Sequence, residues 1–281
     1  MNFQKFILVS ISLAIAASAM AGDETDLAKT SQNPVGNIIS LPFENNYYTD
    51  VGPTEKTVNS MVLKPVIPVN LGKYNLINRL IVPVTYIEGQ DSATVPEDAP
   101  IIGPIQVFPG TDDEFGLGNI QYQAWISPAS PGKLIWGFGP VVELPTNSDD
   151  ALGSDTWSAG PSLLLLTMPG DWVVGAIVQQ MWDVARSSGD DPEVSRFTLQ
   201  PIINYNLEKG WYLTSKPVIT ADWEQEGTDK WSIPVGGGVG RMVKFGKQPV
   251  DFSLAAYKYS KNPDFGPNWD IQLTVKFLFP Q

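Results

Sequence analysis

The chain has 281 residues and a formal net charge of −12, and it contains neither cysteine nor histidine. Without histidine it cannot build a Ser-His hydrolase or a histidine-ligated metal site, and without cysteine it cannot form disulfides. Its acidity also disfavours nucleic acid as a partner, because phosphate binding needs clustered basic side chains. The sequence therefore predicts a protein that is not an enzyme, and it indicates no cofactor.

The first 21 residues have the pattern of a cleaved secretory signal peptide. Lys5 precedes an apolar run at residues 6–17, and Ala19-Met20-Ala21 fits a small-x-small cleavage site. The run is shorter than the roughly 20 apolar residues of a spanning helix, and no later run approaches that length. We therefore expect an exported protein in which residues 22–34 form a periplasmic tail or short plug and residues 35–281 form one domain.

From residue 36 onward the chain divides into strand-like segments separated by turn residues. Single-chain outer-membrane barrels have an even number of strands, and each strand spans the membrane with about 9–11 residues. We expect twelve strands, at 36–46, 57–70, 76–88, 115–127, 133–145, 156–168, 172–183, 195–207, 211–223, 230–243, 250–260 and 268–279.

The last segment shows a clear alternation of apolar and polar residues. Trp269, Ile271 and Leu273 occupy every second position, and Asp270 and Gln272 lie between them. This pattern predicts a strand with one face in an apolar medium and the other in a polar one. A soluble β-sandwich alternates as well, but its strands usually have about five or six residues.

Aromatic residues flank the apolar face at both ends of several segments, at Trp172 and Trp182, Trp211 and Trp223, and Trp269 and Phe279. Ten tilted residues span roughly 25 Å, which is the height of a barrel's apolar band between its two aromatic girdles. The sequence therefore predicts an all-β fold, a transmembrane antiparallel up-and-down β-barrel.

The connections between the segments alternate in length. Those near 71–75, 128–132, 169–171, 208–210 and 244–249 are short, whereas those near 47–56, 89–114, 146–155, 184–194, 224–229 and 261–267 are mostly longer. Short turns typically face the periplasm, so we expect both ends of the barrel there and the longer loops outside. The loop 89–114 carries six acidic residues and no basic one, and we expect it to be the segment that plugs the pore.

Nine prolines fall inside the expected strands, at Pro42, Pro65, Pro68, Pro83, Pro140, Pro161, Pro201, Pro217 and Pro234. Proline has no N–H to donate to a neighbouring strand, so it argues against a regular interior position. These positions predict bulges or local breaks in pairing.

Several motifs resemble a family of Gram-negative outer-membrane proteins that is variously labelled transporter, neuromedin U-like or phenol-degradation meta-pathway protein. They include Asp26-Leu27-Ala28-Lys29, Ser40-Leu41-Pro42-Phe43-Glu44, Gly210-Trp211-Tyr212-Leu213, Thr220-Ala221-Asp222-Trp223 and Ile233-Pro234-Val235-Gly236-Gly237-Gly238. The resemblance extends over nearly the whole mature chain. It implies an outer-membrane barrel that passes small or apolar compounds, and it supplies no catalytic residues. The last strand of an outer-membrane barrel commonly ends in an aromatic residue, whereas this chain ends in Pro280-Gln281.

If the apolar face is outside, the polar face lines the lumen. The charged candidates there are Glu44, Lys64, Arg79, Glu143, Arg196, Lys216, Asp222, Asp270 and Lys276, with Asn119, Gln121 and Gln123 as polar neighbours. Two interpretations are open: the charges pair across a narrow lumen and hold its shape, or some of them form a selectivity ring for a solute. Twelve strands enclose more space than eight and less than sixteen, which predicts a narrow or partly plugged channel.

Three classes of function are compatible with these features. The preferred one is an outer-membrane channel or transporter for small solutes, apolar or aromatic ones included. The alternative is a structural barrel that interacts with lipopolysaccharide through divalent cations, for which Asp112, Asp113 and Glu114 are weak candidate ligands and no firm metal site exists. A barrel enzyme comes last, because histidine is absent. The expected partners are outer-membrane lipid and lipopolysaccharide, and the barrel-insertion machinery and periplasmic chaperones during assembly.

Overall fold

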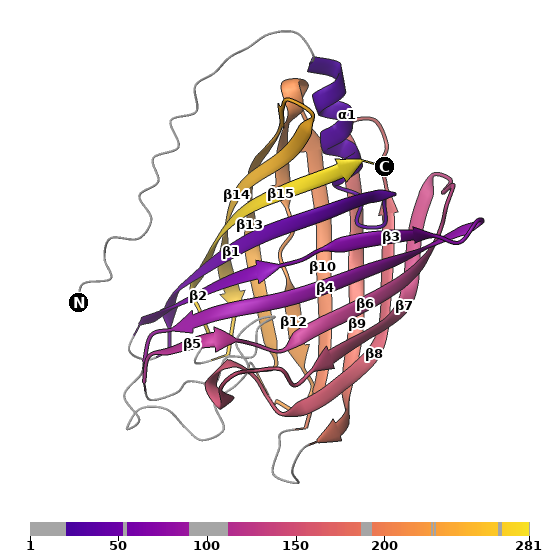
Figure 1. Cartoon of the computed structure of the whole chain (residues 1–281). Helices are drawn as coiled ribbons and strands as arrows, with labels where there is room; N and C mark the ends of the chain where they lie inside the picture. Colours follow the sequence, from indigo (N-terminus) through magenta and orange to yellow (C-terminus); the bar gives the residue numbers. More distant parts are fainter. Residues whose placement is uncertain are drawn as a thin grey trace.

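A computed structural model describes residues 21–52, 55–89, 112–186, 193–225, 227, 229–263 and 266–280. The predicted signal peptide therefore lies outside the described residues, apart from Ala21, and so does most of the expected plug loop 89–114. The chain forms one closed antiparallel β-barrel (Figure 1), which confirms the predicted fold class. Three barrel strands are each split into two segments, so fifteen segments make twelve barrel strands.

The undivided strands are β1 (Ile38–Val51), β4 (Tyr74–Ile87), β7 (Leu134–Leu144), β8 (Thr156–Thr167), β9 (Trp172–Arg186), β10 (Ser195–Asn206), β13 (Trp231–Phe245), β14 (Gln248–Lys261) and β15 (Trp269–Pro280). The divided strands are β2 (Lys56–Leu63) with β3 (Val66–Asn70), β5 (Glu114–Leu117) with β6 (Ile120–Pro128), and β11 (Trp211–Ser215) with β12 (Ile219–Asp222). An α-helix, α1 (Ala21–Ser31), and two short 3-10 helices, η1 (Asp150–Leu152) and η2 (Glu208–Gly210), complete the described elements.

The strands follow one another around the wall in chain order, as an up-and-down barrel requires. The first and last strands close it, because β1 pairs with β15 from Ile38 opposite Pro280 to Thr49 opposite Trp269. Phe279 pairs with Ile39 inside this seam, so the strand's final aromatic residue lies two positions before the chain ends. The closed wall leaves no long unpaired edge.

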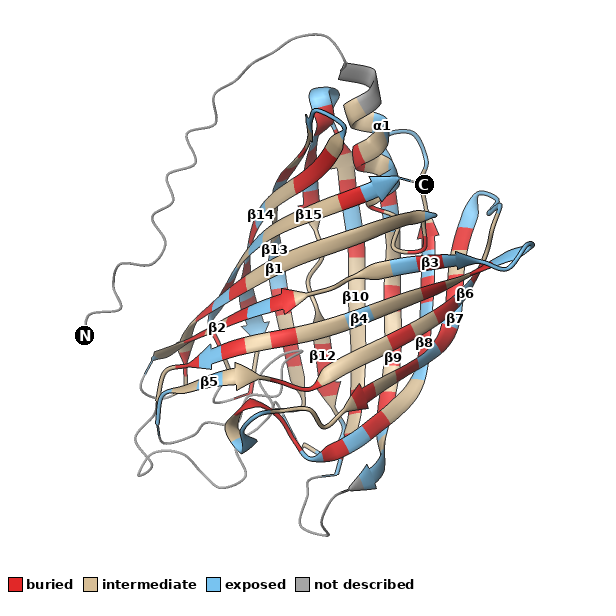
Figure 2. Ribbon diagram, viewed as in Figure 1, coloured by how far each residue is buried: buried red, intermediate tan, exposed pale blue. Residues whose placement is uncertain are grey.

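Burial alternates along the strands, as Figure 2 shows by the bands of different exposure. On β15, Asp270 is buried while Trp269 and Ile271 are exposed, and this order follows the predicted faces. The exposed outer surface is rich in large apolar side chains, including Leu163, Leu165, Ile203, Leu213, Val239, Leu254 and Leu273. Such an exterior suits the hydrocarbon core of a membrane.

Aromatic and basic side chains pair on the outer surface near the strand ends. Trp223 and Trp231 meet edge to face with ring centroids 5.7 Å apart, and the Lys230 ammonium lies 5.5 Å from the Trp223 ring. At the opposite end, the Arg241 guanidinium lies 5.0 Å from the Trp211 ring. Aromatic rings and long basic side chains of this kind suit the interfaces on either side of an apolar band.

The largest error among the expected boundaries is at the end of the first strand. The sequence predicted that the first strand ends at residue 46, but β1 continues to Val51. Tyr48 and Val51 are buried and pack with Val58, Ile87 and Leu152, so burial continues the strand where the sequence suggested a loop. The connection to β2 is therefore only residues 52–55, shorter than the other connections at that end of the barrel.

The prolines coincide with interruptions of the ladders. The β2–β3 and β11–β12 breaks contain Pro65 and Pro217, and Pro234 lies at the register shift between β13 and β14. Each remaining proline lies beside a gap in pairing with a neighbouring strand, at Pro42, Pro68, Pro83, Pro140, Pro161 and Pro201. The missing N–H donors thus explain why twelve barrel strands are divided into fifteen segments.

The segment expected as a tail or plug contains the helix α1, at the end of the barrel that carries the short turns and the C-terminus (Figure 1). Ala28 is fully buried there against Tyr212, Met242 and Leu278. Lys29 in the last turn donates to the Gly170 carbonyl, which ties the helix to the β8–β9 turn. No helix in the described part of the chain is long and apolar enough to cross a membrane.

Candidate functional site

The barrel encloses two adjoining chambers. The loop-side chamber lies toward the longer connections and the helix-side chamber toward α1. Together with their openings to solvent, they contain about 1140 Å³ and about 970 Å³ of space free of protein atoms. Seven residues line both chambers and so mark the place where they meet: Glu44, Lys64, Arg79, Ile177, Gln200, Lys216 and Gln272. We call this ring of seven residues the waist.

Two of the waist cations stand at proline breaks. Lys64 precedes Pro65 between β2 and β3, and Lys216 precedes Pro217 between β11 and β12. The break frees Lys216 from the ladder: its backbone N–H donates to the Tyr257 hydroxyl at 3.1 Å, and its carbonyl accepts from the Gln200 amide at 3.4 Å. The breaks that the prolines cause therefore position charged residues around the lumen.

The waist carries more positive than negative charge. Lys64 forms an ion pair with Glu44, which neutralises both groups. Arg79 donates to the Gln123 amide oxygen at 3.3 Å, and its guanidinium lies 6.0 Å from the Trp125 ring. Within the described residues, neither Arg79 nor Lys216 forms an ion pair with a carboxylate. The seven waist residues thus hold three cations and the single carboxylate of Glu44, so the waist has a net positive charge.

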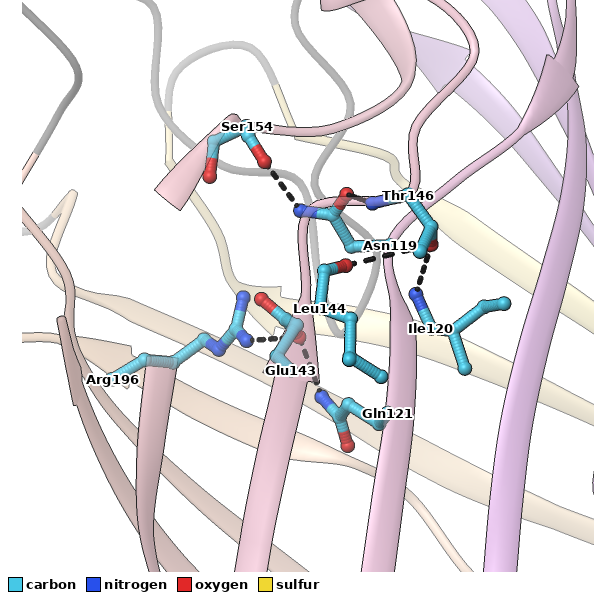
Figure 3. Close-up of polar contacts among 8 residues, drawn as sticks. All are labelled: Asn119, Ile120, Gln121, Glu143, Leu144, Thr146, Ser154 and Arg196. Atoms are coloured by element: carbon cyan, nitrogen blue, oxygen red, sulfur yellow. Dashed lines mark hydrogen bonds and ion pairs between the residues drawn. The ribbon is translucent and has the colours of Figure 1, made fainter. Parts of the chain in front are cut away.

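A second ion pair crosses the loop-side chamber between β7 and β10. The Arg196 guanidinium donates to the Glu143 carboxylate at 2.7 Å, and their side chains are only 3% and 4% exposed. The same carboxylate oxygen accepts from the Gln121 amide at 2.8 Å, as Figure 3 shows. The pair joins strands that are three positions apart around the wall, so it closes off part of the lumen.

Asn119 organises the wall above this pair, at the β5–β6 break. Its amide oxygen accepts from the backbone N–H of Thr146 at 3.2 Å, and its amide nitrogen donates to the Ser154 carbonyl at 2.8 Å (Figure 3). The same oxygen also accepts from the Asn147 N–H at 3.2 Å. The Thr146 hydroxyl bonds both the Ile120 N–H and the Gly118 carbonyl. Side chains here replace the ladder bonds that the break removes.

The helix-side chamber ends at a polar network that holds α1. Lys276 pairs with Asp251 at 3.1 Å and also donates to the Ser31 carbonyl at 2.9 Å. The Tyr212 hydroxyl donates to Asp251 at 2.8 Å. Gln32 and Asn206 exchange amide hydrogen bonds at 2.9 and 3.2 Å. The segment 30–34 and Gly36 line the chamber, so α1 is followed directly by residues that form part of its wall.

Gly240 makes room for Tyr212 in this network. A Cβ at Gly240 would lie 2.1 Å from Cζ of Tyr212 and 2.3 Å from its hydroxyl oxygen. We expect Gly240→Ala to push the ring off Asp251 and to lower the free energy of unfolding by about 1–3 kcal/mol, the usual cost of overpacking. The midpoint of urea unfolding, followed by gel mobility, measures this. Gly132→Ala is the control, because a Cβ there meets nothing within 4 Å; equal midpoints would show that Tyr212 is free to move.

The structure places most of the candidate lumen residues around the two chambers. Glu44, Lys64, Arg79, Glu143, Arg196, Lys216 and Asp270 line the loop-side chamber, as do Asn119, Gln121 and Gln123. Lys276 lines the helix-side chamber and not the loop-side chamber. Asp222 lines neither: it ends β12, and its carboxylate accepts from the Glu224 N–H at 3.1 Å.

Sequence reasoning missed Asp251, Tyr212 and Gln32. Asp251 has the same parity along β14 as the buried Tyr257 and Tyr259, so strict alternation was a signal that would have placed it inside. Tyr212 alternates with the exposed Trp211 and Leu213, so the same signal would have placed it inside. Gln32 had no signal, because nothing in the sequence aligns the N-terminal segment with the barrel wall.

The weak metal candidates lie at the rim of the loop end. The Asp113 carboxylate accepts from the Gly89 N–H at 2.9 Å and from the Tyr86 hydroxyl at 3.0 Å, and these bonds hold the pKa of Asp113 below its usual range. Among the described residues, no group of three or more acidic side chains is arranged to hold a metal ion. Asp113 instead fastens the two ends of the long connection between β4 and β5.

Comparison with known proteins supports the architecture. No family model and no curated protein matches the chain. An outer-membrane channel from Pseudomonas putida F1 has a similar crystal structure, with a TM-score of 0.62 and 16% identity over 88% of this chain and 97% of that one. The NanC porin is similar with a TM-score of 0.50 and 8% identity over 85% and 98%. At these identities the likeness concerns the fold: this chain has the closed barrel fold of Gram-negative outer-membrane channels.

Proposed function

We propose that the protein is an outer-membrane channel through which small solutes pass from the loop-side chamber, across the waist, into the helix-side chamber. The observation that carries this proposal is the pair of chambers, which meet at a polar waist inside a barrel whose exposed exterior is apolar. A structural barrel has no need for two adjoining open spaces along its axis. The similar structures, an outer-membrane channel and a porin, are consistent with this function.

In this proposal the chain is exported with a cleaved signal peptide at 1–21 and inserted into the outer membrane by the barrel-insertion machinery. Residues 22–34 remain at the periplasmic mouth, and residues 35–281 form the barrel. The short turns then face the periplasm and the longer connections face outward, as in other barrels of this kind.

The loop-side chamber suits solutes with an apolar part. Val62, Ile81, Pro83 and Val218 line it beside the charged groups. A pocket that combines apolar walls with a few polar groups binds the apolar body of a solute and orients its polar end. We therefore propose small solutes, including apolar or aromatic ones, as the transported class.

The absence of cysteine offers a direct test of the pathway. In planar bilayers, the purified protein should give discrete conductance steps. In Gln200→Cys, a thiol-reactive methanethiosulfonate reagent should lower that conductance, because Gln200 lies at the waist. Ile203→Cys on the same strand is the matched control, because Ile203 is 43% exposed on the outer face. A silent bilayer, or equal inhibition of both variants, would contradict the proposal.

A further inference from the structure

The waist combines unpaired positive charge with a position that every permeating solute must cross. On either side, the cations are neutralised: Arg196 pairs with Glu143 in the loop-side chamber, and Lys276 pairs with Asp251 in the helix-side chamber. Among the described residues, Arg79 and Lys216 are the two waist cations that form no ion pair, because the waist's single carboxylate, Glu44, is paired with Lys64. The lumen therefore attracts a negative group most strongly at the waist.

The two unpaired cations face each other across the lumen. Arg79 lies on β4 and Lys216 lies at the β11–β12 break. Around the closed wall of twelve barrel strands, these two strands are six positions apart in either direction. A solute that crosses the waist passes between them, and a carboxylate offers two oxygens that can accept from both sides.

The surroundings restrict the rest of the solute. Ile81, Val62 and Ile177 line the loop-side chamber next to the waist and suit an apolar body. The other cations of this chamber, Lys64 and Arg196, are paired with Glu44 and Glu143, so a second negative group on the solute would find no free cation among the described lining residues. The chamber thus has room for an uncharged body and one anionic group at its waist end.

On the basis of the proposed channel function, we infer that the waist selects small organic monoanions, with the carboxylate between Arg79 and Lys216 and the apolar body in the loop-side chamber. The acidic residues of the outer loops do not alter this preference, because exposed charges are screened within about 8–10 Å at physiological ionic strength. A second negative group on a polyanion meets only cations that are already paired, Lys64 and Arg196, whereas a monoanion is held by the waist.

Three probes of nearly the same shape test the charge preference: benzoate, neutral benzamide and cationic benzamidinium. In planar bilayers with a KCl gradient, the reversal potential should indicate anion selectivity, and benzoate should reduce the KCl current more than the other two probes. In Lys216→Gln and Arg79→Gln, the ratio of anion to cation permeability should fall several-fold. Lys73→Gln, which removes the same charge from an exposed short turn, should leave the ratio unchanged.

Cation selectivity of the native protein, or an unchanged ratio in both waist variants, would overturn the inference while leaving the channel itself intact. Lys216→Arg keeps the charge and should keep the selectivity, which separates an electrostatic role from damage to the fold. Titration calorimetry with benzoate on the protein in detergent provides a test that needs no current. Binding that Lys216→Gln weakens several-fold supports the site even if bilayers are silent, and no binding by native protein overturns it.

Discussion

Deleting residues 22–33 should raise the single-channel conductance of the protein several-fold. This deletion removes α1 and the residues Thr30 to Asn33, which line the helix-side chamber. It leaves Val35 in place, which packs with Ile77 and Trp125 inside the barrel. The helix takes no part in the β1–β15 closure or in any other strand pairing, so the barrel should still fold without it. The opening of the helix-side chamber should then be wider.

Planar bilayers measure the change directly. Asp26→Ala is the control for the helix, since Asp26 is exposed and its carboxylate forms no hydrogen bond or ion pair with another described residue; the conductance of this variant should match that of the native protein. Gln32→Ala should give an intermediate result, because it removes the amide pair with Asn206 and leaves the Lys276 contact to Ser31. Equal conductance with and without the helix would mean that solutes do not pass through the helix-side mouth.

Arg196→Met should destabilise the barrel more than any other single change to the lumen charges. It leaves the Glu143 carboxylate buried without its cation, and the Gln121 amide alone does not compensate for that. Breaking a buried ion pair by removing one partner costs about 3–5 kcal/mol, so the free energy of unfolding should fall by that amount. Urea titration in lipid vesicles, read by gel mobility, measures the loss.

The double variant Glu143→Gln with Arg196→Met should recover part of the stability, because it leaves no lone buried charge. Glu88→Gln is the comparison for an exposed pair: Glu88 meets Lys56 at 3.4 Å, with both side chains about one third exposed, and such pairs contribute at most about 1 kcal/mol. If Arg196→Met cost no more than Glu88→Gln, the buried pair would be dispensable for the fold.

The strands of the barrel wall could be predicted from the sequence because the signals that mark them lie within each strand. Alternation with period two marks each strand and both its faces, and the aromatic ends of segments such as 211–223 mark its length. The prolines predicted breaks, but not which ladder each would interrupt. Pro42 on β1 is an example, because its missing N–H lies opposite the break between β2 and β3. Which residues of β2 and β3 lie opposite Pro42 depends on the register between the strands, and the sequence of one strand does not determine that register.

The sequence could predict which residues face the lumen, but not which of them contact one another. Parity along the strands pointed to Glu143 and Arg196, but their contact joins strands three positions apart, and only the closed wall brings them together. The same closure places Lys216 opposite Arg79. Asp222 failed as a lumen candidate because parity does not say how far along the axis a residue lies, and Asp222 stands at the very end of β12.

The break at Lys216 has a consequence for how this barrel is made. Backbone groups that leave the ladder at membrane depth are tolerated where they line a cavity that holds water or polar groups, because hydrocarbon offers them no partner. At Lys216 that partner is the Tyr257 hydroxyl of β14, two strands along the wall. A polar side chain facing the lumen is therefore a condition for assembly as well as for passage, because an apolar interior would leave this N–H without an acceptor.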